Sequence, residues 1–407
     1  MGRYKGDIED GWIWYRRVRL GVLRSAGAGL CLGFCAGEFK FSSRTSPLPR
    51  HSSPVMRDFP PELTDGVIDC LCESSRHAMA PTPRWLAPGL ADKSWKDAMK
   101  TCGLVCKGWL RRSRFHLFSQ LHLREYDLHS FVNVVDASSL PILDFIRHLT
   151  LNFDRSMFDD ALLTRIHRCP NLTRVEAKLY DGLRVTESAG HCLFTHLPLW
   201  ASNAPSLSRL DLAFIGRDSI RTDVILDIAS CIPSLEYLGI YGPSTKIEFD
   251  AASPSLPLPV ALRTLDISLN SGIARLLSQL LARPRVPHLE SLSVEERQRA
   301  TDDLHGALES YMHDAGDRLE SLTLPVHSPQ RAELSRALLL VPKLRHLVLH
   351  IPNPSCASLV LLAVPISALD TLSLCSRAGQ WDPLPWGALD QALAHPHFDA
   401  LRRFNFH

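Results

Sequence analysis

Cysteine and histidine are the residue types of this chain that could hold a metal ion or act as nucleophile and base. The sequence has 11 Cys and 18 His. The pairs Cys70-x-Cys72 and Cys102-x3-Cys106 lack both a second cysteine pair and nearby histidines at the spacing that a zinc site needs. The spacing therefore predicts no metal site and no cofactor.

Motifs of enzymatic chemistry are also missing from the sequence. It contains no Gly-x-Ser-x-Gly elbow, no phosphate-binding Gly-Lys-Ser/Thr loop, no His-Glu-x-x-His pair and no set of protein-kinase motifs. His395 and His397 flank a proline, which favours a turn over a pair of ligands. We therefore expect no catalytic residue, and an enzyme is the least favoured class of function.

A run of cations, Lys107, Arg111, Arg112 and Arg114, is another cluster that could bind a ligand. Such a run favours a solvated face near a helix C-terminus, where a cation gains about 0.3–1 kcal/mol, and phosphate binding is the alternative. The chain has a net charge of +2, while residues 1–55 carry nine Lys/Arg and four Asp/Glu, a net of +5. The remainder is then −3, so we expect no nucleic-acid partner.

Composition predicts a globular protein. The 407 residues are 45% hydrophobic and 22% charged, which suits two or three domains or one long repeat array. The odd number of scattered cysteines indicates reduced thiols and a cytoplasmic or nuclear location. Residues 1–55 are expected to be a disordered or mis-annotated leader, with Met56 as the alternative start. Their uncharged run at 25–37 is shorter than the roughly 20 residues that cross a bilayer, so no membrane partner is expected.

A repeated pattern of apolar residues from residue 146 to the end predicts the strands and helices of this region. Apolar residues spaced as Leu-x-x-Leu-x-Leu recur ten times, with first positions 25 to 35 residues apart. These first positions are Ile146, Leu172, Leu207, Leu235, Leu262, Leu289, Leu319, Leu344, Leu369 and Leu401. Prolines stand two residues before five of them, and helix-like stretches lie between units. The fold class expected is α/β, with one strand and one helix per repeat and a parallel sheet lining a curved solenoid.

This pattern resembles the leucine-rich repeat family, and Cys169-Pro170-x-Leu172 resembles its cysteine-containing class. Of the ten units, the one from Leu265 to Ile273 matches the full consensus, so the repeats are degenerate. A non-repetitive α/β domain is the alternative. It is disfavoured because the sequence lacks the Gly-rich phosphate loop that a doubly wound enzyme fold needs.

Strand alternation assigns the polar neighbours of the buried leucines to the concave face, where we expect a protein substrate to bind. The mixture of charged residues with tyrosines suits protein recognition. The candidate substrate-binding residues are Arg174, Glu176, Lys178, Arg209, Asp211, Tyr237, Tyr241, Thr264 and Asp266. A solvated face without a partner is the alternative, with binding on the convex side or on the insertion at 184–202.

Residues 59–123 have a different, helical pattern. Pro60-Pro61-Glu62-Leu63 predicts a helix that starts with proline in its first turn, and a second block ends in Leu104-Val105-Cys106-Lys107-Gly108-Trp109. The unit has more apolar side chains than it can bury alone. It resembles an F-box, of the version expanded in mushroom-forming fungi. The resemblance departs at Phe59, which replaces the usual leading Leu, and at a loop insertion near 80–94.

An F-box followed by leucine-rich repeats resembles the substrate receptors of cullin-type ubiquitin ligases. The resemblance implies that the F-box docks on a Skp-type adaptor, which bridges to a cullin, and that the repeats capture an unknown protein substrate. The residues matching adaptor-facing positions are Pro60, Leu63, Ile68, Leu71, Leu104, Val105, Trp109 and Leu110.

The expected domains are a leader at 1–55, the F-box at 56–123, a linker helix region at 124–140 and the repeats at 141–407. One alternative is an interaction scaffold of leucine-rich repeats that acts outside a ubiquitin ligase. Another is that the helical segment is an ordinary hairpin packed on the rest of the chain.

Overall fold

Most of the described structure lies between residues 107 and 406. The computed structural model describes residues 66, 68–70, 99–101, 107–138, 141–153, 160–180, 189–215, 220–242, 247–248, 256–269, 272–283, 288–296, 304–326, 331–351, 357–361, 364, 369–376 and 386–406. The chain divides into two units, 1–58 and 59–407, and every described residue belongs to the second. The expected leader and the expected loop at 80–94 lie outside the described residues.

One parallel sheet of eleven strands is the framework of the second unit. Its strands, in the order in which they pair, are β1 (Gln120–Arg124), β2 (His148–Phe153), β3 (Arg174–Tyr180), β4 (Arg209–Ile215), β6 (Tyr237–Gly242), β8 (Thr264–Leu269), β9 (Ser291–Glu296), β10 (Ser321–Pro325), β11 (His346–Ile351), β12 (Thr371–Ser376) and β13 (Arg403–Phe406). The short strands β5 (Ile220–Arg221) and β7 (Ile247–Glu248) form a separate parallel pair. Because parallel neighbours follow one another along the chain, each connection must cross back over the sheet.

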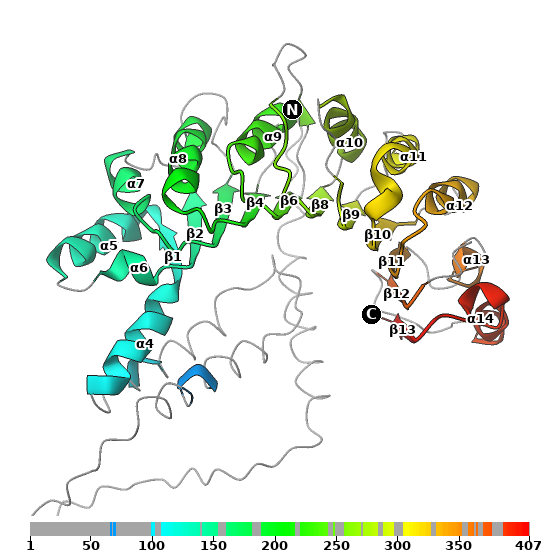
Figure 1. The fold of residues 1–407 in the computed structure, drawn as a ribbon, viewed down its shortest axis with the longest axis horizontal. Coiled ribbons are helices and arrows are strands. Elements are labelled where there is room, and N and C mark those ends of the chain that lie inside the picture. Colours follow the sequence, from blue (N-terminus) through cyan, green and yellow to red (C-terminus); the bar gives the residue numbers. More distant parts are fainter. Residues whose placement is uncertain are drawn as a thin grey trace, which may run out of the picture. The chain divides into compact units, whose positions relative to one another are not determined.

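Helices make most of these crossings, on one face of the sheet (Figure 1), while the described residues between β6 and β8 include no helix. They are α5 (Glu125–Ala137), α6 (Ile142–Phe145), α7 (Asp160–Ile166), α8 (Ala189–Asn203), α9 (Thr222–Ser230), α10 (Ile273–Ala282), α11 (Leu304–Ala315), α12 (Arg331–Leu339), α13 (Ala357–Leu361) and α14 (Trp386–Leu393), with the 3-10 turns η1 (Gly316–Arg318) and η3 (Pro396–Phe398). Figure 1 shows the strands along the inner side of an arc and these helices along its outer side. The predicted α/β class with a parallel sheet is confirmed.

The same hydrogen-bonded corner leads into most strands. The carbonyl of Arg263, the residue before β8, accepts backbone N–H groups from Glu290 at 2.8 Å and Ser291 at 3.0 Å in the next repeat. Equivalent carbonyls from Arg147 to Asp370 accept two N–H groups each. The corner thus satisfies the backbone where the chain changes direction and holds neighbouring repeats in register.

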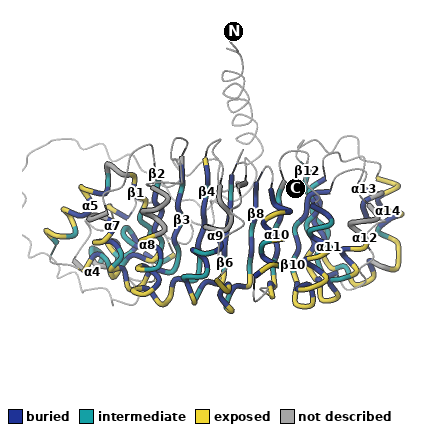
Figure 2. Tube along the Cα trace, turned by 90° about the horizontal axis from the view of Figure 1, so that it is seen from above, coloured by how far each residue is buried: buried dark blue, intermediate teal, exposed yellow. Residues whose placement is uncertain are grey.

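The apolar residues of the repeat motif form the core between sheet and helices. Leu265 and Ile267 on β8 are fully buried, as predicted for Leu265. Figure 2 shows buried residues along the strands and exposed residues at the turns. Helix α10 adds buried Leu276 and Leu277 from the other side. It begins after Gly272, whose φ of 80° lies in the left-handed region that glycine tolerates.

The sheet begins one strand earlier than the sequence predicts. β1 pairs with β2 so that Leu121 lies beside Leu149 and Leu123 beside Leu151. The helix α4 (Lys107–Ser119) runs straight into β1, and α5 follows in the region expected to be a linker. The signal was present in the sequence, since Phe118-x-x-Leu121-x-Leu123 has the motif spacing with an aromatic first residue.

Candidate binding surface on the sheet

Strand register gathers the predicted concave residues into rows that cross β3, β4, β6 and β8. The first row is Arg174, Arg209, Tyr237 and Thr264; the second is Glu176, Asp211, Gly239 and Asp266; the third is Lys178, Ala213, Tyr241 and Ser268. The neighbours on β3, Val175 and Ala177, are fully buried on the helix side. The predicted alternation between buried and outward-facing residues is therefore present on β3.

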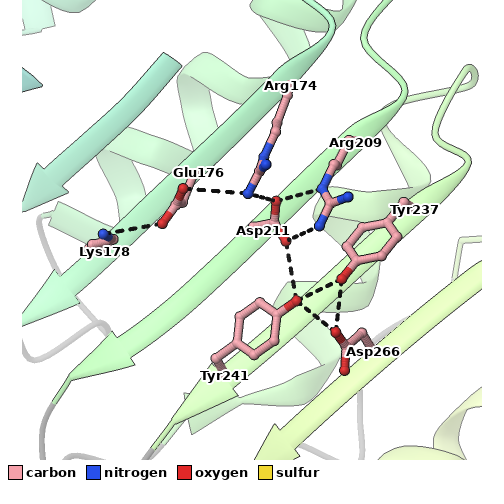
Figure 3. A network of polar contacts seen from close by, with 8 residues as sticks. All are labelled: Arg174, Glu176, Lys178, Arg209, Asp211, Tyr237, Tyr241 and Asp266. Carbon is pink, nitrogen blue, oxygen red and sulfur yellow. Dashed lines mark hydrogen bonds and ion pairs between the residues drawn. The ribbon is translucent and has the colours of Figure 1, made fainter. Parts of the chain in front are cut away.

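Eight of the nine predicted residues make direct polar contacts with one another (Figure 3). We call this set the polar network: Arg174, Glu176, Lys178, Arg209, Asp211, Tyr237, Tyr241 and Asp266. Thr264, the ninth, lies beside Tyr237 in the first row and is not a member.

Asp211 is the centre of the polar network. Its Oδ2 lies 2.8 Å from Nη2 of Arg174 and accepts a hydrogen bond of 2.8 Å from Nε of Arg209. A second nitrogen of Arg209 donates to Oδ1 at 3.2 Å. The Asp211 side chain is only 3% exposed. It therefore lies beneath its partners and is not on the accessible surface that was expected.

Two tyrosines link Asp211 to Asp266 across the strand between them. The hydroxyls of Tyr237 and Tyr241 lie 2.7 Å from each other, and each lies 2.9 Å from Oδ2 of Asp266. Because each phenol has one proton, two of these three contacts are donated at a time. Tyr241 also lies 3.3 Å from Oδ1 of Asp211. The guanidinium of Arg209 stacks 3.7 Å from the ring centre of Tyr237.

Gly239 makes this arrangement possible. It stands between Asp211 and Asp266 in the second row, and a Cβ there would lie 2.6 Å from the Tyr241 hydroxyl and 2.7 Å from Asp211 Oδ1. The absence of a side chain lets the Tyr241 ring lie across its own strand. Gly239 was not among the predicted site residues, although the pattern Tyr-x-Gly-x-Tyr is visible in the sequence.

Burial changes the acid–base properties of the tyrosines. Burial first, and the Asp266 carboxylate second, raise the pKa of Tyr237 to about 12. The same causes raise the pKa of Tyr241 well above its usual value. Burial opposes the charge on Arg209, but the hydrogen bonds and charge of Asp211 outweigh it and raise the pKa of Arg209. At neutral pH both phenols therefore keep their protons and act as hydrogen-bond donors.

The polar network is electrically balanced. Glu176 completes it by lying 3.5 Å from Arg174 and 3.2 Å from Lys178, so the network has three cations and three carboxylates. Its eight members include no Ser, Cys or His. The arrangement suits rigid presentation of Tyr and Arg surfaces to a binding partner.

The concave face of the later strands is built differently. Small hydroxyl residues occupy it on β9, β10 and β12: Ser291, Ser293, Ser321, Thr323, Thr371 and Ser373. We call these six residues the hydroxyl face. His346 and His350 stand on β11 among them. Short side chains leave the sheet backbone closer to the surface here than in the polar network.

The expected adaptor-binding segment is described in part. Pro60, Leu63, Leu71, Leu104 and Val105 lie outside the described residues. Trp109 and Leu110 on α4 are half-buried. Ile68, expected to face an adaptor, instead has no exposed surface, because it is in a small core with Met99 against which Trp109 and Leu117 pack.

Arg112 and His116 on α4 contact the carboxylate of Asp69 in the preceding helical segment. Arg112 donates two hydrogen bonds to the Asp69 carboxylate, at 2.8 and 2.6 Å, and Nε2 of His116 lies 2.7 Å from it. Hydrogen bonding from Arg112 lowers the pKa of Asp69. Arg112, expected on a solvated basic face, thus has a structural partner.

Comparisons with known proteins identify no family for this chain. No protein-family model matches it, and no curated protein matches it. Within the described part of the chain, none of the helices has both the length and the apolar character that a membrane crossing requires.

Proposed function

We propose that this chain is the substrate-recognition subunit of a cullin-type ubiquitin ligase. In this proposal the segment before α4 and α4 itself form an F-box that docks on a Skp-type adaptor. The strands β1 to β13 form a curved solenoid of degenerate leucine-rich repeats that binds a protein substrate, in the cytoplasm or nucleus. The chain contributes no catalytic residue in this role.

One observation carries the proposal: a small helical unit with its own core leads without a break into a one-sided parallel sheet. Ile68, Met99 and Trp109 pack together, and α4 continues directly into β1. A partner held by the helical unit would therefore be coupled to the sheet through a continuous helix. The F-box-like sequence at the start and the repeat motif in the sheet agree with this division of labour.

A second candidate is a leucine-rich-repeat scaffold that never joins a ligase. The burial of Ile68 and the Asp69–Arg112–His116 contacts favour it, since they use part of the helical unit for internal packing. The two candidates differ in whether the half-exposed side of α4 is occupied by an adaptor.

Co-expression with a Skp-type adaptor separates them. The wild-type chain is expected to co-purify with the adaptor, and a Leu63→Asp/Leu110→Asp variant is expected to lose it, because charged side chains cannot be desolvated against an apolar partner. Val134→Asp places the same type of change at an exposed position of α5 and should retain the adaptor. An adaptor that never co-purifies with the folded wild-type chain would favour the scaffold.

A further inference from the structure

A pocket lies at the end of the sheet where the strands β10 to β13 begin. Its volume is about 570 Å³, and its lining includes Lys343, Arg345, Arg402, Glu320 and Asp370. Four of these five residues hold the same place in consecutive repeats, directly before a strand. They therefore follow one another at roughly the 4.8 Å spacing of neighbouring strands. We call this feature the rim pocket.

The cations of the rim pocket are poorly neutralised. In the described part of the chain, the side chains of Lys343 and Arg345 form no ion pair or hydrogen bond. Nε of Arg402 is 3.9 Å from Asp370, and the Arg402 side chain is 82% exposed. Arg263, at the same repeat position, lies closer to its carboxylate, 3.3 Å from Glu290. With three cations and the two carboxylates Glu320 and Asp370, the lining of the rim pocket has a net charge of +1, and its unpaired cations are available to an anionic group.

The surroundings of the rim pocket indicate which anion fits. Glu320 and Asp370 alternate with Arg345 and Arg402 along the rim, which suits the separate carboxylates of a peptide better than the continuous row of phosphates of a nucleic acid. Ser321 and Thr371 follow them directly in the chain and belong to the hydroxyl face, which offers hydrogen-bond partners to a peptide backbone. The exposed Arg403 is the strand partner of Thr371 and adds another cation beside that face.

We propose that the rim pocket binds an acidic segment of a protein partner, with carboxylates placed between Lys343, Arg345 and Arg402. The backbone of that segment then continues over the hydroxyl face of β10 to β12. This inference rests on the proposed function only in taking the sheet as the part of the chain that binds a substrate. It places the main electrostatic contact away from the polar network, whose charges are already paired.

Fluorescence anisotropy with the full chain tests the proposal. The probe is a labelled peptide of alternating Glu and Ser, and its control is the same peptide with Gln in place of each Glu. The pocket variant is Arg345→Glu/Arg402→Glu. Its matched control, Arg147→Glu/Arg263→Glu, makes the same charge change at the same repeat position outside the pocket. Circular dichroism checks that both variants fold.

The wild-type chain is expected to prefer the Glu peptide, with binding that weakens as salt is added. The pocket variant should bind it about tenfold more weakly or worse, because like charges then face each other, while the matched control should bind as the wild type does. Equal binding of both peptides, or unchanged binding by the pocket variant, would overturn the proposal. So would tighter binding of single-stranded DNA that is lost in the same variant.

Adaptor capture from the same preparations keeps the two proposals apart. The pocket variant should retain the adaptor, since its changes lie far along the sheet from α4. A wild-type chain that binds the acidic peptide but no adaptor would contradict the ligase function and support the rim pocket. The reverse result would contradict the rim pocket and support the ligase function.

Discussion

The concave face changes character between β8 and β9, while the buried face beneath it does not. On β3 to β8 long polar side chains pair with one another, and the carboxylate of Asp211 forms ion pairs with both Arg174 and Arg209. On β9 to β12 the first two rows hold Ser and Thr except on β11, which has His346 and Val348 there. Leu265 and Leu347, at equivalent motif positions in the two regions, are both fully buried. The repeat thus determines the backbone and core, and leaves the outward positions to be used for internal pairing or for binding.

The difference matters for how each region could bind. A partner that engages Arg174 or Arg209 must compete with hydrogen bonds that those side chains already make to Asp211. A partner of Arg345 has no such bond to displace. The polar network is therefore better suited to holding tyrosine and arginine surfaces in place, and the later strands with the rim pocket are better suited to new electrostatic contacts.

The largest losses of stability are expected from changes in the buried core, which the two regions share. Leu265→Ala and Leu347→Ala should each lower the free energy of unfolding by about 2–5 kcal/mol, because each removes a fully buried side chain and leaves a cavity. Urea denaturation followed by circular dichroism measures both. If Leu347→Ala were as stable as the wild type, the two regions would not share one core.

The next largest loss of stability should appear in the polar network and not in the rim pocket. Asp211→Asn keeps the shape of a nearly buried side chain but removes the charge that pairs with two arginines, so we expect a loss of about 1–3 kcal/mol. Asp370→Asn is the matched change in the rim pocket, where the ion pair is 3.9 Å long and its arginine is exposed, and should stay within about 0.5 kcal/mol of the wild type. Equal losses from both changes would contradict the distinction between paired and available charges.

The leucine spacing was sufficient to predict the sheet, its parallel order and the sidedness of β3, β4, β6 and β8. Strand periodicity carries this information locally, since alternate residues must face opposite sides. The contacts of the polar network were not predictable in the same way. They depend on which residues of neighbouring strands share a row, and on the space that Gly239 leaves for the Tyr241 ring. Neither is set by the spacing within one strand.

The helical segment shows another limit of sequence patterns. Ile68 and Trp109 were assigned together because both are apolar and match one motif. In the structure Ile68 is fully buried, while Trp109 packs half-exposed at the margin of the same small core. Which apolar residue is used for internal packing depends on how the helices dock. The Asp69–Arg112 ion pair, which spans 43 residues of sequence, contributes to that docking.

A smaller effect tests whether Gly239 is needed for the tyrosine contacts. Gly239→Ala puts a Cβ too close to the Tyr241 hydroxyl, and should cost about 1 kcal/mol, at the low end for overpacking, because the ring can swing toward solvent. Gly387→Ala on α14 meets nothing within 4 Å and should instead stabilise the protein by about 0.5 kcal/mol. Adding Tyr241→Phe, which removes the crowded hydroxyl, should restore part of the loss from Gly239→Ala. A Gly239→Ala variant of wild-type stability would mean that the network tolerates the displacement.

The smallest signal should come from the titration of one tyrosine among the seven in the sequence. The pKa of Tyr237 is about 12 in the folded chain, against 10.0 for an unperturbed tyrosine. The folded protein therefore keeps this proton to a higher pH than the unfolded chain does. Stability should therefore fall as the pH rises from 10 toward 12. Asp266→Asn removes the nearby negative charge, and should move the Tyr237 ionisation to lower pH, seen as more phenolate absorbance below pH 11. Asp370→Asn, on the other side of the comparison, should leave the titration curve unchanged. A curve that is identical in the wild type and in Asp266→Asn would show that the network does not control this tyrosine.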